Sequence, residues 1–289
     1  MSGQYPDIPS WHNAVTPYTT DIMNASFFPS VQSIAMMKCP QSGGTEAVHN
    51  CIGYAVDRAP GPVLYVYPDE ATAKENAQDR VIPMLMASPR LREYMTGMAD
   101  DLSALRIKLA HMTIHMAWSG SASRLGNKPI RHLVLDELDK YQNQKKEASS
   151  EALAEKRVIT WGRKARIWKI STPTVVNGAI HRAWQLAEAR YRYHVICPAC
   201  GTELLMEFEN IRWQDDMKPV QIKSRSLAWY ECQHCGAHWT DADRDEAVLR
   251  GCWREKAGGY GTHGAFGSSA PYFHWFSHSR VDFPFREAR

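Results

Sequence analysis

One stretch of the sequence combines residue types that suit phosphate binding. Residues 33–51 form an apolar run, a turn rich in glycine and a segment with helical spacing, in that order. When the pattern G-x-x-x-x-G-K-[ST] is laid over residues 38–45, Gly43 takes the second glycine position and Thr45 the hydroxyl position. Gly44 stands where lysine is expected, and Lys38 stands at the front of the loop.

This loop can still do the chemistry of a phosphate-binding loop. The backbone N–H groups of Ser42, Gly43 and Gly44 can cradle a phosphate at the N-terminus of a helix. Thr45 can hold Mg²⁺, and Lys38 can reach back over the loop. Because the strict pattern fails, a plain Gly-Gly turn is the alternative interpretation.

Paired carboxylates follow a second apolar run. In residues 131–140, three apolar residues lead into Asp136 and Glu137, which predicts a buried strand with an acidic end. An ATPase needs one carboxylate at a strand tip to position the metal and a neighbour to activate the attacking water. Asp136 and Glu137 fit these roles as catalytic residues. The alternative is a strand followed by a helix that Asp136 caps.

Four cysteines in two Cys-x-x-Cys pairs indicate a metal site. Cys197 pairs with Cys200, and Cys232 pairs with Cys235. Four thiolates close a tetrahedral zinc site and leave no position for a substrate or a water, so the Zn²⁺ is expected to be structural.

The remaining cysteines and the segment between the pairs give further expectations. Cysteines outside the pairs are expected to be small buried residues: Cys39, Cys51 and Cys252. Apolar residues between the pairs are expected to pack a small β-unit: Phe208, Ile211 and Trp213.

The sequence resembles the large subunit of tailed-phage terminases of the lambda-like type. Five regions carry the resemblance in the order of that family: Thr16-Pro-Tyr18 with Asp21-Ile-Met23, residues 37–46, residues 135–141, Ser171-Thr-Pro-Thr174 and Cys197-Pro-Ala-Cys200. The resemblance implies a P-loop ATPase that uses ATP and Mg²⁺ to move double-stranded DNA into the capsid. In that family the loop lysine stands at the front of the motif, as Lys38 does.

The resemblance also implies roles for other residues. Relatives often carry an arginine inside the loop, where this chain has Gln41, so an arginine finger is expected from Arg124, Arg157 or a neighbouring subunit. Ser171 and Thr172 are expected to sense the γ-phosphate, the alternative being a turn that caps the next helix. Residues that match the adenine-binding segment are Trp11, Pro17 and Tyr18.

The implied partners are a terminase small subunit and the capsid portal, and the active form is expected to be a homo-oligomer. Full-length relatives continue into an RNase H-like nuclease domain. This chain ends at Arg289 without room for it, so DNA cleavage by this chain alone is not expected.

Apolar runs alternate with helical patterns, which predicts an α/β fold with a mainly parallel sheet flanked by helices. Expected strands are 61–68, 131–136 and 165–170, with one or two more in 105–118. Expected helices are 45–56, 69–86 with a break near Pro83, and 142–156. The expected divisions are an N-terminal arm without clear periodicity (1–30), a P-loop ATPase domain (31–190), a zinc-ribbon region (191–256) and an irregular tail (257–289).

Charge and hydropathy limit the possible functions. With 34 Lys and Arg against 31 Asp and Glu, the net charge of +3 does not by itself indicate nucleic-acid binding. The sequence contains no run of eighteen apolar residues and no signal-peptide pattern, so we expect no membrane span and a location in the host cytoplasm.

Two function classes remain after these observations. The first is an ATP-hydrolysing motor subunit for packaging viral DNA. The second is a catalytically inert zinc-ribbon module that binds nucleic acid or protein, and a helicase-like ATPase is a third possibility.

Overall fold

The computed structural model describes residues 11–126, 128–142, 148–213, 221–222 and 227–256. Its elements up to the last central strand are α1 (Pro17–Ala25), β1 (Ser33–Met37), α2 (Gly44–Arg58), β2 (Val63–Tyr67), α3 (Glu70–Asn76), η1 (Ala77–Val81), α4 (Ile82–Ala87), α5 (Pro89–Arg92), η2 (Ala99–Asp101), β3 (Leu102–Ser103), β4 (Arg106–Lys108), β5 (Thr113–Trp118), α6 (Ala122–Leu125), β6 (His132–Asp136), η3 (Leu138–Lys140), α7 (Ser150–Glu155), η4 (Ile159–Lys164) and β7 (Arg166–Ser171). The later elements are α8 (Ala179–Gln185), β8 (Tyr191–Ile196), β9 (Glu203–Leu204), η5 (Phe208–Asn210), β10 (Ile211–Arg212), β11 (Trp229–Glu231), β12 (His238–Trp239), α10 (Asp241–Leu249) and β13 (Cys252–Glu255).

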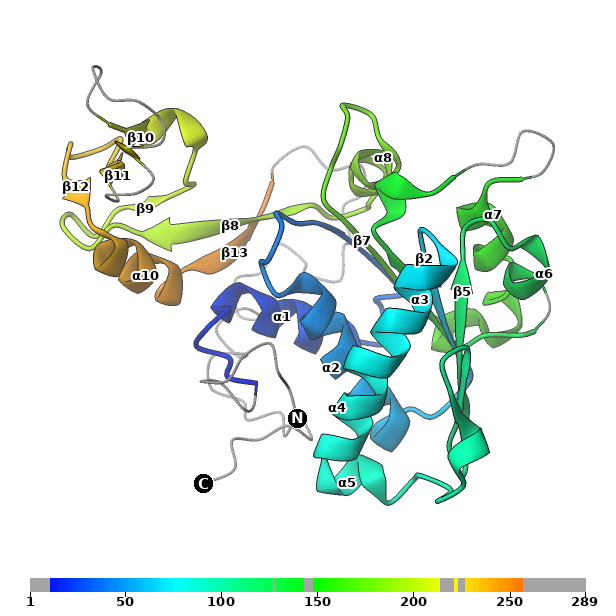
Figure 1. Ribbon diagram of the computed structural model, residues 1–289. Coiled ribbons are helices and arrows are strands. Elements are labelled where there is room, and N and C mark those ends of the chain that lie inside the picture. Colours follow the sequence, from blue (N-terminus) through cyan, green and yellow to red (C-terminus); the bar gives the residue numbers. More distant parts are fainter. Residues whose placement is uncertain (1–10, 127, 143–147, 214–220, 223–226, 257–289) are drawn as a thin grey trace.

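A seven-stranded sheet forms the centre of the main body, in the order β1-β7-β6-β2-β5-β4-β3 (Figure 1). β1, β7, β6, β2 and β5 pair in parallel, and β4 and β3 add antiparallel strands at one edge. Helices α2 to α5 pack on one face over one hydrophobic core, and α6 and α7 pack on the other face over a second. The predicted α/β fold with a mainly parallel sheet flanked by helices is therefore confirmed.

The central strands have the composition that burial on both faces requires. All five residues of β2 and all five of β6 are buried, and both strands are almost continuously apolar. Alternation in β6 points Leu133 and Leu135 into the core under α6 and α7, and Val134 into the core under α2. Asp136, two residues after Val134, shares its face of the sheet, which is the face that α2 covers.

Several predicted elements are confirmed by the structure. The helix after the loop is α2, and residues 105–118 contain two strands, β4 and β5. The predicted helix 69–86 forms as α3, the π-helix η1 and α4 in direct succession. Since Pro83 has no N–H to donate, the wider turn of η1 just before it lets the chain continue without a sharp break.

One helix was not predicted, and one predicted helix begins later than expected. The N-terminal arm contains helix α1, which begins with Pro17 at its first position, where the missing N–H costs nothing. The helix predicted from residue 142 begins only at Ser150 in the described residues, because Ser149 caps it by accepting a hydrogen bond from the Ala152 N–H.

Helix α8 packs against β1 and β7 of the central sheet, and the elements from β8 onward form a smaller unit beside the main body, at the upper left in Figure 1. We call the described residues between 191 and 255 the cysteine module. It contains the sheets β13-β8-β9 and β10-β11-β12, and helix α10 packs on β8. Its own hydrophobic core includes Cys197, Cys232 and Trp239. The predicted irregular tail, residues 257–289, lies outside the described residues.

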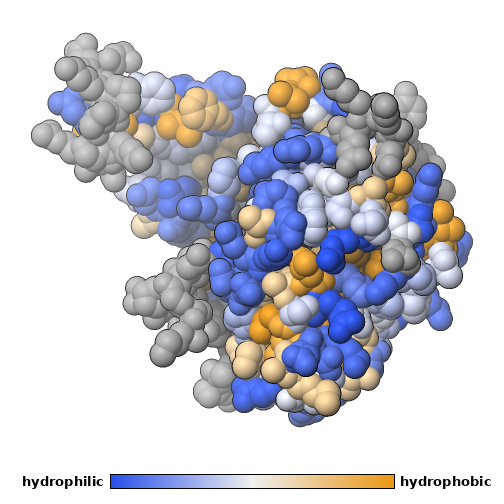
Figure 2. Space-filling view, turned by 45° about the vertical axis from the view of Figure 1, so that its right-hand side comes forward, coloured by the Kyte–Doolittle hydropathy of each residue, from blue (hydrophilic) through white to orange (hydrophobic). Residues whose placement is uncertain are grey.

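The surface of the main body mixes hydrophilic residues with small hydrophobic patches on the face that Figure 2 shows. Scattered exposed apolar residues of this kind are normal for a folded domain. Among the helices that the structure describes, none has the length and apolar character needed to span a bilayer.

Candidate nucleotide site and cysteine cluster

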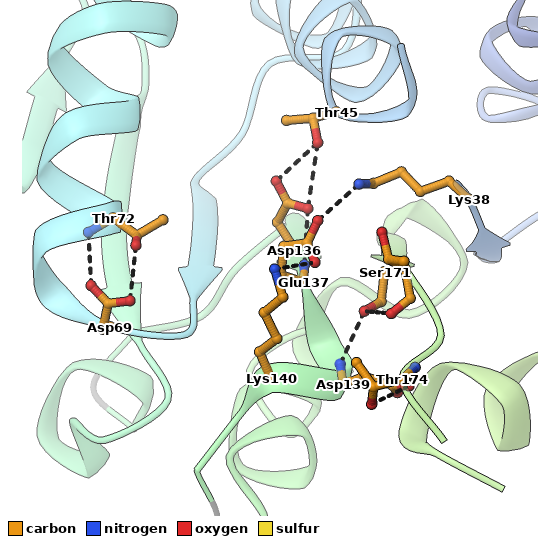
Figure 3. A network of polar contacts seen from close by, with 11 residues as sticks. Lys38, Thr45, Asp69, Thr72, Asp136, Glu137, Asp139, Lys140, Ser171 and Thr174 are labelled. Atoms are coloured by element: carbon orange, nitrogen blue, oxygen red, sulfur yellow. Dashed lines mark hydrogen bonds and ion pairs between the residues drawn. The ribbon is translucent and has the colours of Figure 1, made fainter. Parts of the chain in front are cut away.

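The carboxyl ends of β1, β7 and β6 meet at one edge of the sheet, and the candidate nucleotide residues lie there (Figure 3). β1 leads into the loop, β6 ends at Asp136 and β7, which lies between them, ends at Ser171. The Lys38 N–H donates to the Ser171 carbonyl over 3.1 Å, which fixes the start of the loop against β7. Ligand sites of open α/β sheets lie at this edge.

Lys38 points from the front of the loop toward the acidic end of β6. Its Nζ lies 2.8 Å from Oε1 of Glu137, and its side chain is only 9% exposed. A Cβ atom at Gly44 would lie 2.7 Å from Lys38 Cδ and 3.0 Å from Met36 Sδ. The Lys38 side chain thus occupies the space that a side chain at position 44 would need. The front-placed lysine and the glycine at position 44 are therefore sterically matched in this chain.

Thr45, in the first turn of α2, faces Asp136 across the site. Its hydroxyl donates to the Asp136 carboxylate, at 3.2 Å from Oδ2 and 3.5 Å from Oδ1. Burial raises the pKa of Asp136, while the nearby charge of Lys38 and the Thr45 hydroxyl act in the opposite direction. A hydroxyl and a carboxylate at this distance are the oxygen ligands that Mg²⁺ prefers.

Glu137 adopts a backbone conformation that is uncommon outside glycine, with φ at 54°. Burial by itself raises its pKa, but hydrogen bonds from Lys38 and Lys140 outweigh this and hold the pKa below its usual value. Glu137 is therefore ionised and held between two lysines. Such local strain at a strand end is typical of functional positions.

The loop itself is closed by its own contacts. The Ser42 hydroxyl donates to the Cys39 carbonyl over 2.8 Å, and Gln41 is exposed with φ at 59°. Gly43 precedes α2 with φ at 75° and supplies no side-chain cap. The first N–H groups of α2 therefore have no partner within the helix and can serve an anion.

Asp139 lies at the centre of a hydrogen-bond network that the sequence analysis missed. Its N–H donates to Ser171 Oγ over 3.1 Å, and its carboxylate accepts hydrogen bonds from Thr174 N–H and Ile180 N–H. The Ser171 hydroxyl in turn donates to the Thr172 carbonyl over 3.1 Å. Asp139 thus ties the segment after β7, and the start of α8, to the acidic end of β6. Its spacing of three residues from Asp136 was the available signal.

A second set of charged side chains lies at the first turns of α2. Arg80 forms an ion pair with Glu46, the residue after Thr45, and His49 lies near the same carboxylate. Burial raises the pKa of Glu46, but His49 and Arg80 together outweigh this effect and lower the pKa to about 2. This pair joins η1 to the first turn of α2 and supports the position of Thr45. Sequence analysis gave no signal for it, because the partners come from different helices.

The four paired cysteines converge in the cysteine module. Their sulfur atoms lie within 4.8 Å of one another, and Cys197 Sγ is 3.9 Å from Cys235 Sγ. Zn–S bonds of about 2.3 Å place tetrahedral sulfurs about 3.8 Å apart, so this set fits one Zn²⁺. Cys197 and Cys232 are buried, while Cys200 and Cys235 are exposed.

Each Cys-x-x-Cys pair is shaped by a backbone turn. The Gly201 N–H donates to the Cys197 carbonyl over 2.9 Å, and the Gly236 N–H donates to the Cys232 carbonyl over 2.8 Å. Hydrogen bonding with Thr202 lowers the pKa of Cys200 to about 6, which favours the thiolate that metals bind.

Comparison with known proteins shows the family of the chain. The sequence profile of the family described as "Phage terminase large subunit gpA, ATPase domain" matches residues 7–253. The chain belongs to this family. The curated "Terminase, large subunit" of Enterobacteria phage P21 is 22% identical over 242 residues, which are 79% of this chain and 36% of that protein. The chain thus spans little more than a third of this relative.

Solved structures include a more distant similarity. A mutant of the large terminase ATPase domain of Thermus phage P74-26 has a TM-score of 0.38 and 13% sequence identity, over 61% of this chain and 70% of that one.

In this terminase ATPase domain, the two arginines considered as fingers make other contacts. Arg124 lies over the ring of Trp118, with 5.3 Å from its guanidinium carbon to the ring centroid. Arg157 donates to the carbonyls of Leu153 and Gly126. Each guanidinium is thus held by residues of its own chain.

The structure of the terminase domain also corrects two expectations about packing. Cys39 is exposed rather than buried, because it lies in the loop at the edge of the sheet; Cys51 is buried and Cys252 is intermediate. Phe208 is 75% exposed and Trp213 is 43% exposed, so of the three residues expected to pack a β-unit only Ile211 contacts the core of the cysteine module.

Gly43 of the terminase domain yields a stability prediction. A Cβ atom there would lie 3.1 Å from Thr16 Cγ2, and φ is 75°, whereas Gly97 has φ of 76° and open space around it. We expect Gly97→Ala to lower the free energy of unfolding by about 1–2 kcal/mol, from the left-handed conformation alone. Gly43→Ala should lower it further, since Thr16 must also move. Urea unfolding measures both, and equal losses would contradict the contact with Thr16.

Proposed function

We propose that this chain is an ATP-hydrolysing motor subunit that packages viral DNA into capsids. The observation that carries the proposal is the meeting of Lys38 and Thr45, from the loop, with Asp136 and Glu137, from the end of β6. These four residues supply a cation for phosphate, a hydroxyl and a carboxylate for a metal, and a base for water.

The proposed hydrolysis divides the work among the chain's own residues. The N–H groups of Ser42, Gly43 and Gly44 hold the phosphates at the start of α2, beside Gln41. Thr45 and Asp136 would hold Mg²⁺, which neutralises charge on the phosphates when bound. Glu137 orients the attacking water and accepts its proton. Ser171 and Thr172, between the loop and the carboxylates, are placed to respond to the γ-phosphate.

The ion pair between Lys38 and Glu137 gives this proposal a distinct first step. Before nucleotide binds, Lys38 forms an ion pair with Glu137. The positive charge that would hold phosphate is thus occupied by the carboxylate that would activate water. Arriving phosphate draws Lys38 away, since a phosphate group carries more negative charge than one carboxylate. Glu137 then becomes free to accept a proton.

The cysteine module is proposed to hold one structural Zn²⁺ through Cys197, Cys200, Cys232 and Cys235. Support comes from the sulfur separations, which suit a tetrahedral site, and from the use of all four positions by thiols. We further propose that residues 31–190 act as the ATPase domain and residues 191–256 as the zinc-ribbon region.

The partners are proposed from the family. Double-stranded DNA, a terminase small subunit and the capsid portal are the expected partners of a terminase large subunit, and activity is expected from a homo-oligomer. The proposed location is the host cytoplasm. The arginine finger is proposed to come from a neighbouring subunit, since Arg124 and Arg157 are held by other groups in this chain.

Replacing Lys38 with alanine tests the proposal directly. A charge-assisted hydrogen bond contributes about 1.5–3 kcal/mol, so Lys38→Ala should weaken Mg-ATP binding by about tenfold to a hundredfold. Titration calorimetry measures the affinity. Lys74→Ala is the matched control, because Lys74 is an exposed lysine in α3 that pairs with Glu70.

The outcomes separate the two function classes. Equal affinity of the wild type and Lys38→Ala would contradict the assignment of the lysine. A wild-type chain that gains no thermal stability from Mg-ATP would contradict nucleotide binding and favour the inert module, because a ligand that binds only the folded state must stabilise it.

A further inference from the structure

The loop and the cysteine module contact one residue of α1 from opposite sides. The Tyr18 hydroxyl donates to the Ser42 carbonyl in the loop over 3.1 Å. The Tyr18 carbonyl accepts a hydrogen bond from the Trp253 indole N–H of β13 over 2.8 Å. Segments that lie far apart in the sequence are therefore joined through a single residue, in the place where Figure 1 shows α1 between α2 and the module.

Aromatic packing strengthens this connection on the module side. The ring of Tyr193, in β8, packs edge-on against Tyr18 at 5.7 Å and against Trp253 at 5.4 Å between centroids. Edge-on pairs at this separation stabilise a contact beyond the area that they bury. The Tyr193 hydroxyl donates to the Val248 carbonyl at the end of α10, over 2.8 Å. Tyr18 therefore contacts a fixed part of the module and not a loose side chain.

On the loop side, α1 meets the backbone next to a residue in the left-handed conformation. Ser42 precedes Gly43, which has φ of 75°, stands directly before α2 and lies against Thr16. The N–H groups expected to bind phosphate belong to the same residues. A shift of this backbone on phosphate binding must change the position of the Ser42 carbonyl, and with it the hydrogen bond to Tyr18.

β8 extends this connection to the cysteine cluster. The strand runs from Tyr191 to Ile196, and Cys197 is the next residue. β8 also pairs with β13 over its first four residues, so backbone hydrogen bonds connect the two strands.

We propose that Tyr18 is a positioning residue that couples the phosphate-binding loop to the cysteine module. This inference rests on the proposed nucleotide site. Nucleotide in the loop changes the dynamics of β8 and β13 through the Tyr18 hydroxyl and carbonyl, and by reciprocity the state of the module alters affinity at the loop.

Hydrogen exchange on the full chain tests the coupling, with AMP-PNP and Mg²⁺ as the probe. In the wild type, the probe should slow exchange in residues 39–46 and also change exchange in residues 191–196 and 251–255, by about fivefold or more. Tyr18→Phe keeps the ring but loses the hydroxyl. It should lose the response of the module.

Two further variants complete the test. Trp253→Phe removes the indole N–H at the other end, outside the residues expected to bind nucleotide. It should keep the response of the loop and lose the response of the module, a split that a merely structural residue would not produce. The test therefore stands even if Tyr18→Phe fails to fold. Tyr94→Phe removes a hydroxyl that bonds Asp57 at the far end of α2 and should retain both responses.

Each contrary result overturns the inference in a recognisable way. A module that responds in Tyr18→Phe and Trp253→Phe as in the wild type would show that the coupling does not pass through Tyr18. A wild type whose loop responds while its module does not would show that no coupling exists. A loop without any response would instead contradict the proposed nucleotide site, and the coupling would fall with it.

Discussion

Glu137→Gln should bind Mg-ATP at least as tightly as the wild type while hydrolysing it about 10²- to 10⁴-fold more slowly. Binding is retained because Glu137 acts on the water and not on the ground-state phosphates. The substitution also breaks the ion pair between Lys38 Nζ and Glu137 Oε1, which are 2.8 Å apart. Lys38 is then expected to be free for the nucleotide. Single-turnover hydrolysis measures the rate, and calorimetry measures the affinity.

The matched control for this prediction is Glu70→Gln. Glu70 forms an exposed ion pair with Lys74 in α3, and such surface pairs contribute little, so the control should keep both affinity and rate. Hydrolysis by Glu137→Gln within a few-fold of the wild-type rate would contradict the assignment of the base. A parallel loss of affinity would instead mean that Glu137 helps to hold the nucleotide.

Cys200→Ser should abolish zinc binding and unfold the cysteine module. Freshly purified wild-type protein should contain about one zinc per chain, because the four sulfurs form one closed site. Apparent binding free energies of structural zinc reach about 10–16 kcal/mol, so a small unit that loses a ligand loses most of its stability. Elemental analysis gives the zinc content, and tryptophan fluorescence on heating follows unfolding, to which Trp229, Trp239 and Trp253 of the module contribute among the ten tryptophans of the chain.

Cys39→Ser is the matched control, because Cys39 is an exposed cysteine outside the cluster. It should retain the full zinc content. Zinc absent from the wild type, or undiminished in Cys200→Ser, would refute the proposed site. Zinc lost in both variants would mean that Cys39 contributes to metal binding, which the structure does not support.

The parts of the site that are continuous in sequence could be predicted. The loop 38–45 directly follows the apolar strand β1, and Asp136 and Glu137 stand at the end of the buried strand β6, so the apolar pattern alone places them at strand ends. Since parallel strands of one sheet end at the same edge, their convergence also follows. The two Cys-x-x-Cys pairs could also be predicted, because the spacing within each pair is visible in the local sequence.

Contacts that depend on the order of strands could not be predicted. The ion pair of Lys38 with Glu137 joins residues 99 positions apart, and it exists because β7 alone separates β1 from β6. Asp139 was missed for the same reason, as its partners lie beyond β7.

Other misses have local causes. Helix α1 has only nine residues, too few for a reliable apolar period, and it gains stability from its contacts with α2 and β13. The exposure of Trp213 and Phe208 could not be predicted either, because aromatic composition does not tell which side chains a small unit leaves exposed.

The pairing of β8 with β13 has a consequence for the evolution of such proteins. The two strands run antiparallel with Tyr191 opposite Glu255, so the chain enters and leaves the cysteine module at neighbouring points. Segments whose ends lie side by side can be inserted into a protein, or exchanged, without redirecting the chain around them. No strand of the central sheet comes from the module among the residues that the structure describes. A gene could therefore acquire, lose or replace this unit in one recombination event and keep its sheet intact, with Tyr18 and α1 as the surface that the incoming unit would have to fit.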